Sequence, residues 1–232
     1  GVPPDYFSST GQLWGTPVYS WEKHKETDFQ WWKNRFKRQF ELVDILRLDH
    51  FRALVAHWRI DGKAKDAING DWINSPGQEL LTSIKEFLNV ENLPIIAEDL
   101  GIINQDVINL RRKFGLPGMK ILQFAFDGNN DNPYLPKNIN GNNWVVYTGT
   151  HDNSTTLSWW NDLDKTIKEN IQKEFSFSNN PSWELIELGM KSKANLFIAP
   201  IQDILCLDDS SRTNKPGTCL LYTSDAADEE RG

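Results

Sequence analysis

The sequence lacks the residue patterns that build disulfide frameworks, metal centres and membrane spans. Its two cysteines, Cys206 and Cys219, form neither a disulfide framework nor a metal-ligand spacing, so a reducing compartment such as the cytoplasm is favoured. The four histidines have no His-x-x-x-His spacing and no cysteine partners, so no catalytic metal is expected. No run approaches the roughly 18 apolar residues of a membrane span, and no cofactor motif is apparent. We therefore expect a protein that uses neither a membrane nor a cofactor.

The sequence also lacks an excess of basic residues. The 25 basic and 32 acidic residues give a formal net charge of −7, which argues against a general binder of nucleic acid or acidic lipid. No Gly-x-Gly-x-x-Gly or phosphate-loop motif follows an expected strand, which argues against a nucleotide-binding sheet.

Aromatic residues, in contrast, are abundant. The ten tryptophans could fill a core or stack on the apolar faces of sugars, and the count alone favours the core. Residues 1–20 combine Gly, Pro, Ser and Thr with Tyr6, Phe7 and Trp14, which is typical of a long loop that carries aromatic side chains. Long loops of this kind are often functional.

Helical and strand patterns alternate along the chain. Helices are expected at residues 28–41, 79–89, 104–114, 153–161, 163–175 and 182–197, with Asn104 and Ser182 as N-caps. Strands are expected at 42–49, 93–99, 119–126, 143–150 and 198–205, and the first is apolar enough to be buried on both faces. This alternation predicts an α/β fold with a parallel sheet, and a (β/α) barrel is favoured over a nucleotide-binding sheet. Because five strands are fewer than the eight of a closed barrel, we expect N-terminal strands outside this chain.

Three carboxylates stand at the ends of expected strands: Asp49, Glu98 and Asp152. In a (β/α) barrel the catalytic groups come from the C-terminal ends of different strands. A single acid in such a place is more often a cap for the following helix. Three acids together, accompanied by Arg47, His50 and His151, favour an active site.

Two of these acids are expected to differ in protonation. Arg47 and Asp49 are two residues apart on a strand, so they point to the same side, and the arginine favours the charged carboxylate. Glu98 follows an apolar stretch, which disfavours its ionisation and lets it keep a proton near neutrality. One ionised and one protonated carboxylate is the arrangement that glycoside chemistry requires.

Five strings occur in order: "GVPPDYFSSTGQLWGTPVY", "LRLDHFR", "IIAEDLG", "FGLPGMKILQFAFDG" and "YTGTHDN". Together they resemble the 4-α-glucanotransferases called amylomaltase or disproportionating enzyme, glycoside hydrolase family 77, which are relatives of the α-amylases. The resemblance covers about residues 1–218. It implies that this segment is the C-terminal part of a (β/α)8 TIM barrel of the α-amylase superfamily type.

The resemblance also implies residue roles. Asp49 matches the family nucleophile, Glu98 the general acid/base, and Asp152 the third carboxylate, which binds sugar hydroxyls and stabilises the transition state. The implied substrate contacts are Arg47, His50, His151, Tyr6, Phe7, Trp14, Phe124, Phe126 and Asn214. Of these, Tyr6, Phe7 and Trp14 belong to a segment that resembles a mobile lid.

The implied reaction transfers an α-1,4-glucan segment to the 4-hydroxyl of glucose or another glucan, with retention through a glycosyl-enzyme. The expected substrates are maltooligosaccharides and starch or glycogen chains, with glucose as an acceptor. Two alternatives stay open: an α-amylase-type hydrolase, and a non-catalytic α-glucan-binding protein, which could lose a carboxylate without harm. The oligomeric state is not specified by the sequence.

Residues 219–232 depart from the family pattern. They read "CLLYTSDAADEERG", without apolar periodicity, and "LLYTSDAADE" resembles translated sequencing-adapter readthrough. We expect this tail to be non-native. Because a barrel short of strands has open edges, we also expect the isolated 232-residue chain to fold poorly and to be weakly active or inactive.

Overall fold

The computed structural model describes residues 1–5, 8–101, 103–177 and 180–216. Tyr6, Phe7 and the tail at 219–232, which the sequence singled out, lie outside these residues. The chain divides into two compact units, Gly1–Met119 and Lys120–Gly232. Among the described helices, none combines the length and apolar character needed to cross a membrane.

The first unit alternates helices and strands. Its helices are α1 (Trp21–Glu26), α2 (Gln30–Phe40), α3 (Gly77–Leu88) and α4 (Gln105–Lys113), with a 3-10 turn at Phe51–Leu54. Its strands are β1 (Leu46–Leu48), β2 (Ala56–Arg59), β3 (Asp71–Asn74) and β4 (Ile95–Ala97). β1 and β4 pair in parallel, with Arg47 opposite Ile96, as the βα alternation predicts.

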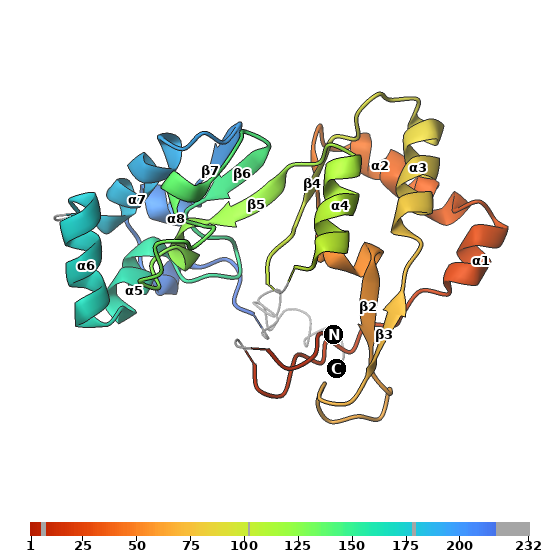
Figure 1. Cartoon of the computed structure of the whole chain (residues 1–232), viewed down its shortest axis with the longest axis horizontal. Helices are drawn as coiled ribbons and strands as arrows, with labels where there is room; N and C mark the ends of the chain where they lie inside the picture. The colour runs from red at the N-terminus through yellow and green to blue at the C-terminus, as the bar shows by residue number, and fades with distance from the viewer. Residues whose placement is uncertain (6–7, 102, 178–179, 217–232) are drawn as a thin grey trace, which may run out of the picture. The chain divides into compact units, whose positions relative to one another are not determined.

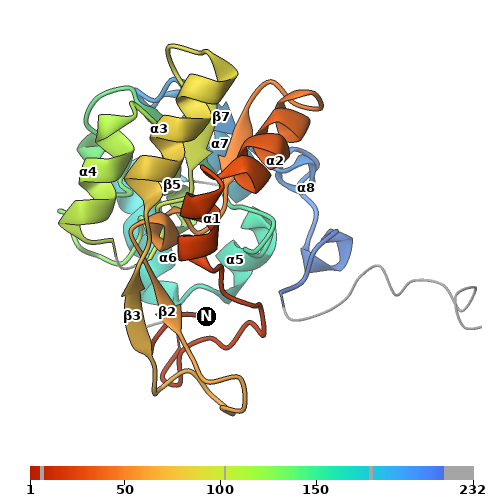
Figure 2. The same ribbon diagram turned by 90° about the vertical axis from the view of Figure 1, so that its right-hand side faces the viewer.

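Apolar faces of the helices form the core of this unit. α2 and α3 pack against each other (Figure 2), and Phe36, Leu81 and Ile95 are buried in one cluster. The predicted N-cap of α4 is confirmed, because the Asn104 side chain accepts a hydrogen bond from the Val107 N–H at 3.1 Å. These helices support the strand ends that carry Asp49 and Glu98.

The antiparallel β2–β3 hairpin was not expected from the sequence. It extends away from α2 and α3 in both views (Figures 1 and 2). Trp58 and Trp72 lie opposite each other in its register, with ring centroids 5.3 Å apart. This cross-strand aromatic pair stabilises a hairpin whose strands are short.

The predicted strand at 42–49 is too long and not buried on both faces. Only Leu46–Leu48 form β1, and Leu42, Val43 and Ile45 are exposed. Among the described residues β1 is hydrogen-bonded to β4 alone, so no strand pairs with its other edge there. The apolar run therefore lacks the second neighbour that would extend and bury it.

The second unit is built on a three-stranded sheet in the order β5-β6-β7 (Figure 1). The strands are β5 (Gly118–Ile121, which begins at the end of the first unit), β6 (Trp144–Tyr147) and β7 (Leu196–Ile198). The helices are α5 (Thr156–Asp162), α6 (Lys165–Phe175), α7 (Pro181–Met190) and α8 (Ile201–Ile204). Shorter 3-10 turns occupy Leu122–Phe124, Pro136–Asn138 and Asp209–Ser211.

Three predicted boundaries in this unit are wrong. The strand expected at 119–126 ends at Ile121, where a 3-10 turn begins. The helix expected at 182–197 spans Pro181–Met190, and Asn180 caps it by accepting from the Trp183 N–H, because proline suits the first helical position and displaces the cap from Ser182. The strand expected at 198–205 lies earlier, at Leu196–Ile198, and the residues after Pro200 form α8.

Candidate active site

The candidate nucleophile Asp49 follows β1 directly. An Arg47 guanidinium nitrogen lies 2.8 Å from an Asp49 carboxylate oxygen, so the prediction that both side chains share one side of the strand is confirmed. The Asp49 side chain is 76% exposed, whereas that of Arg47 is 28% exposed. The arginine therefore orients a carboxylate that stays open to an incoming molecule.

His50 links the end of β1 to Glu98. Its backbone is left-handed, with φ at 48°, an uncommon conformation for a residue other than glycine. This conformation accompanies a 2.7 Å hydrogen bond from the His50 N–H to Glu98 Oε2. The Glu98 carboxyl group is thereby held by the residue that follows Asp49.

Burial raises the pKa of Glu98 above its ordinary value. Hydrogen bonds from the Leu100 and His50 N–H groups act in the opposite direction. The Asp49 charge raises this pKa further and the Arg47 charge lowers it, and the net direction is upward. The direction expected from the apolar strand before Glu98 is confirmed.

A buried ion pair supports the segment after Glu98. Arg111 Nε lies 3.1 Å from Asp99 Oδ2, and both side chains are almost fully buried. The other Asp99 oxygen accepts the Met119 N–H at 2.8 Å, while Arg111 donates to the Leu116 carbonyl. The pair therefore connects the end of β4 to α4 and to the start of β5.

A cavity of about 410 Å³ lies within the first unit, beside Asp49. Its lining includes Trp14, Tyr19 and Trp32, together with the consecutive residues 46–49. Because side chains alternate along a strand, contact with four consecutive residues means that the cavity follows the unpaired edge of β1.

His50 and Trp14 form a second group beside this cavity. Their rings meet edge to face, with centroids 4.9 Å apart. Burial, followed by the charge of Arg52, lowers the pKa of His50 to about 4, although the Asp49 charge opposes the shift. Among the described residues His50 Nε2 is buried and has no hydrogen-bond partner.

The second unit brings together three of the expected site residues. Asn214 Nδ2 donates to Asp152 Oδ1 at 3.1 Å and to the His151 carbonyl at 3.0 Å. His151 Nε2 lies 3.4 Å from the other Asp152 oxygen. Asp152 remains about half exposed, so its carboxyl group is oriented and still accessible.

Three residues that support this group were missed in the sequence: Asp203, Asp209 and Arg212. Asp203 is buried and hydrogen-bonded to both ends of the segment that carries Asp152. The available signal was an acid inside the otherwise apolar string "IAPIQDIL". Nothing in the sequence indicated its partners, which lie about fifty positions away.

The expected sugar contact at Phe126 stays a prediction. Phe126 is buried in the core of the second unit, where its ring packs against Trp159 and Phe175. Phe124 is only partly buried, so it remains able to contact a ligand.

No metal site was found among the residues that the structure describes. These residues contain no group of three or more His, Cys, Asp and Glu side chains that could hold a metal ion.

Comparisons with known proteins connect this geometry to a family. A family model described as 4-alpha-glucanotransferase matches residues 1–223. The chain belongs to the 4-alpha-glucanotransferase family. It is 48% identical over 220 residues to the 4-alpha-glucanotransferase of Synechocystis sp., covering 94% of this chain and 43% of the relative. It is 44% identical over 225 residues to the Thermus thermophilus 4-alpha-glucanotransferase, covering 94% of this chain and 45% of that protein.

Solved structures of amylomaltases are also similar to this chain. The amylomaltase from Streptococcus agalactiae in complex with acarbose matches with a TM-score of 0.87 at 37% identity, covering 94% of this chain and 44% of that one. The amylomaltase from Corynebacterium glutamicum matches with a TM-score of 0.74 at 16% identity, over 94% of this chain and 36% of that chain, which shows the shared fold alone. The chain is a mixed α/β structure that spans less than half the length of these relatives.

Proposed function

We propose that a protein containing this sequence, at the full length of its relatives, is a 4-alpha-glucanotransferase. It transfers α-1,4-glucan segments to the 4-hydroxyl of glucose or of another glucan. The observation that carries the proposal is the coupling of Asp49 and Glu98: the residue after Asp49 holds a Glu98 whose pKa is raised. Membership of the 4-alpha-glucanotransferase family supports the substrate class.

The proposed first half-reaction uses Asp49 as the nucleophile. Its carboxylate attacks the anomeric carbon of the donor while protonated Glu98 gives its proton to the departing glycosidic oxygen. The bond to the leaving segment breaks, and a glycosyl ester forms on Asp49. The Arg47 contact keeps the Asp49 carboxylate oriented for this attack.

The second half-reaction uses Glu98 as a base. Glu98 takes the proton of the acceptor 4-hydroxyl, whose oxygen attacks the anomeric carbon and releases Asp49. Esterification removes the Asp49 charge, which otherwise raises the pKa of Glu98. The pKa of Glu98 therefore falls in the intermediate, when a base is needed.

The remaining site residues are proposed to bind the glucan. Asp152 binds sugar hydroxyls and stabilises the transition state, with His151 and Asn214 beside it; its assignment rests on the family likeness of its motif. Transfer exceeds hydrolysis when a sugar meets the intermediate before water does. An aromatic lid at residues 1–20, with Trp14 against His50, is proposed to favour the sugar.

The proposed substrates are maltooligosaccharides and starch or glycogen chains, with glucose as an acceptor. The related amylomaltase that holds acarbose, an oligosaccharide-like compound, supports a carbohydrate ligand. The low cysteine content supports a reducing compartment such as the cytoplasm as the place of action.

Residues 1–218 are proposed to form the C-terminal part of a (β/α)8 barrel. The parallel pairs β1–β4 and β6–β7 support this architecture. The cavity along the unpaired edge of β1 and the exposed Leu42, Val43 and Ile45 support a further strand at that edge. Residues 219–232 are proposed to be non-native, and the family match ends inside this segment, at residue 223.

The proposal is tested in a chimera in which residues 1–218 replace the matched part of the Synechocystis sp. relative. We expect the chimera to convert maltotriose into glucose and longer chains without a net gain of reducing ends. Net production of reducing ends would instead indicate a hydrolase, and binding without turnover would indicate a glucan-binding protein.

Substitutions assign the roles. Asp49→Asn should abolish turnover, and Glu98→Gln should lower it by about 10²–10⁴-fold, the range of general acid–base catalysis. The exposed acids Asp44 and Glu91 offer matched controls, since Asp44→Asn and Glu91→Gln remove the same charges outside the site. Full activity of Asp49→Asn would contradict the proposal.

A further inference from the structure

The segment that carries His151 and Asp152 is a loop of residues 149–155 between β6 and α5. Its two ends meet at Asp203 of α8. One Asp203 oxygen accepts the Thr148 hydroxyl at 2.5 Å and the Thr156 hydroxyl at 2.8 Å. The other oxygen accepts the Thr156 N–H at 2.7 Å. Asp203 therefore fixes the spacing of the two points at which the loop begins and ends.

These contacts are buried. Asp203 is 1% exposed, and neither threonine is measurably exposed. A carboxylate in such a place is costly unless several hydrogen bonds satisfy it, and an apolar side chain could occupy the position at a lower cost. If Asp203 only stabilised the core, its contacts would not all need to come from one loop. Among the residues that the structure describes, the three hydrogen bonds to the Asp203 carboxylate all come from the two ends of the Asp152 loop.

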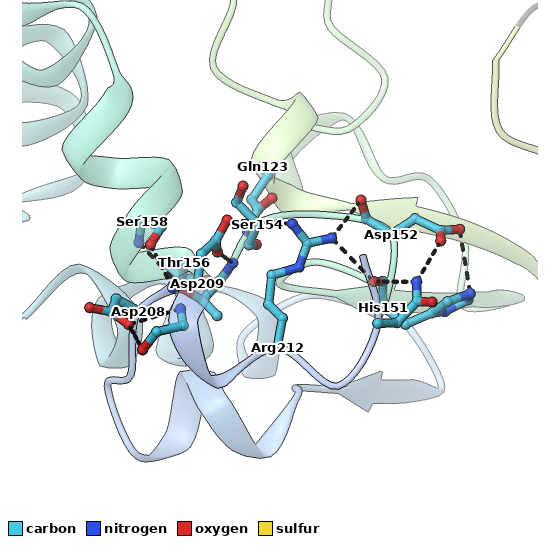
Figure 3. A network of polar contacts seen from close by, with 12 residues as sticks. Gln123, His151, Asp152, Ser154, Thr156, Ser158, Asp208, Asp209 and Arg212 are labelled. Carbon is cyan, nitrogen blue, oxygen red and sulfur yellow. Dashed lines mark hydrogen bonds and ion pairs between the residues drawn. The ribbon is translucent and has the colours of Figure 1, made fainter. Parts of the chain in front are cut away.

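A second set of contacts holds the middle of the same loop. Asp209 Oδ1 accepts the Thr155 N–H at 2.7 Å, and Asp209 Oδ2 lies 3.4 Å from Arg212 Nη1. Arg212 Nη2 in turn donates to the carbonyls of Asp152 at 3.3 Å and His151 at 3.5 Å (Figure 3). The guanidinium thus touches the backbone of the two residues whose side chains face the substrate in the proposed reaction.

We propose that Asp203 and Arg212 are positioning residues, which set the place of the Asp152 carboxylate through the two ends and the middle of its loop. The inference rests on the proposed function, in which Asp152 stabilises the transition state. Asp203 and Arg212 touch no reacting atom. They act through the backbone that carries Asp152, and Asp209 holds Arg212 in place.

The expected effect is on catalysis more than on binding. A misplacement of a catalytic group by about 1 Å can cost on the order of 10²-fold in rate. We therefore expect Asp203→Ala to lower kcat of the chimera by about 10- to 100-fold. Its KM should change by a smaller factor, because Trp14 and the other binding groups of the first unit are untouched. Arg212→Met should also lower kcat, since it removes the contacts to the backbone of His151 and Asp152 together with the ion pair to Asp209.

Ile171→Ala provides a control for loss of stability. Ile171 is buried in α6 within the same unit and has no contact with the loop in the interactions described above. Its replacement creates a cavity, so it should lower the unfolding midpoint while leaving kcat unchanged at temperatures well below unfolding. Asp203→Asn should recover part of the activity, because its carbonyl oxygen still accepts the Thr156 N–H.

A double-mutant cycle with Asp152→Asn tests whether Asp203 acts through Asp152. The cycle is measured with α-maltosyl fluoride, a reactive donor that keeps slow variants measurable. If Asp203 acts through Asp152, then Asp203→Ala causes little further loss in the Asp152→Asn background. An equal loss in both backgrounds would overturn the inference, as would wild-type kcat in both Asp203→Ala and Arg212→Met. If Asp203→Ala does not fold, the same cycle with Arg212→Met gives the decision.

Failure of the proposed function and failure of the positioning role give different results. A chimera that never turns over maltotriose, or that keeps its activity after Asp49→Asn, refutes the proposed function. A chimera that needs Asp49 and Asp152 but is indifferent to Asp203 and Arg212 refutes only the positioning role.

Discussion

Replacing Arg111 by methionine should strongly lower the free energy of unfolding, because it breaks the buried ion pair that supports the segment after Glu98. The Arg111 and Asp99 side chains are 5% and 7% exposed, and their charged atoms lie 3.1 Å apart. Methionine fills much of the same volume without the charge. The Asp99 carboxylate would then stay buried after losing its ion pair with Arg111, while the hydrogen bond from the Met119 N–H would remain.

The magnitude follows from the cost of breaking a buried ion pair. Removing one partner of a buried ion pair typically costs about 3–5 kcal/mol. We expect the upper half of this range, because the substitution also removes the hydrogen bond from Arg111 to the Leu116 carbonyl. Replacing both Arg111 and Asp99 by apolar residues should recover much of the loss, since the desolvation cost of the charges then disappears as well.

The assay is equilibrium unfolding of the chimera in denaturant, followed by tryptophan fluorescence. Arg112→Met is the matched control, because Arg112 is the exposed neighbour on the same helix. We expect that control to cost less than about 0.5 kcal/mol. Similar unfolding midpoints for the two methionine variants, or no recovery when both charges are removed, would refute the reasoning.

Four further predictions concern the acid/base, a helix cap and the isolated chain. Because the first half-reaction needs protonated Glu98, kcat/KM should fall as the pH rises through its raised pKa; an increase over that interval would exclude this role. In the Asp49→Asn variant the pKa of Glu98, followed by NMR titration, should be lower than in wild type, because a neighbouring negative charge has gone. Asn104→Ala should lower the free energy of unfolding by about 1 kcal/mol, measured in denaturant, because the Val107 N–H loses its acceptor; no change would mean that this cap contributes little. The isolated 232-residue chain should disproportionate maltotriose weakly or not at all, since the edge of β1 is unpaired in the described residues; robust turnover would contradict this expectation.

The features that the sequence predicted correctly are local ones. Arg47 and Asp49 share a side because alternation along a strand needs no knowledge of the rest of the fold. Asn104 caps α4 by a contact over three residues. The raised pKa of Glu98 follows from the apolar residues just before it.

The features that were missed depend on distant partners. The length of β1 is set by which strands pair with it, and the apolar string at 42–49 carries no information on that point. Asp203 meets Thr148 and Thr156 across about fifty residues, so no local pattern predicts the contact. The strand expected at 119–126 was too long because β5 gives way to a 3-10 turn at Leu122–Phe124.

The most direct test of the central claim is to identify the residue that carries the glycosyl group. The Glu98→Gln form of the chimera is incubated with α-maltosyl fluoride, whose fluoride leaves without needing a proton. The intermediate should then accumulate, because no base assists its transfer to an acceptor. After proteolysis, mass spectrometry should find one maltosyl group on the peptide that contains Asp49, and none in the Asp49→Asn variant. A maltosyl group on Asp152 or another residue, or fluoride release without any labelled peptide, would contradict the assignment of Asp49 as the nucleophile.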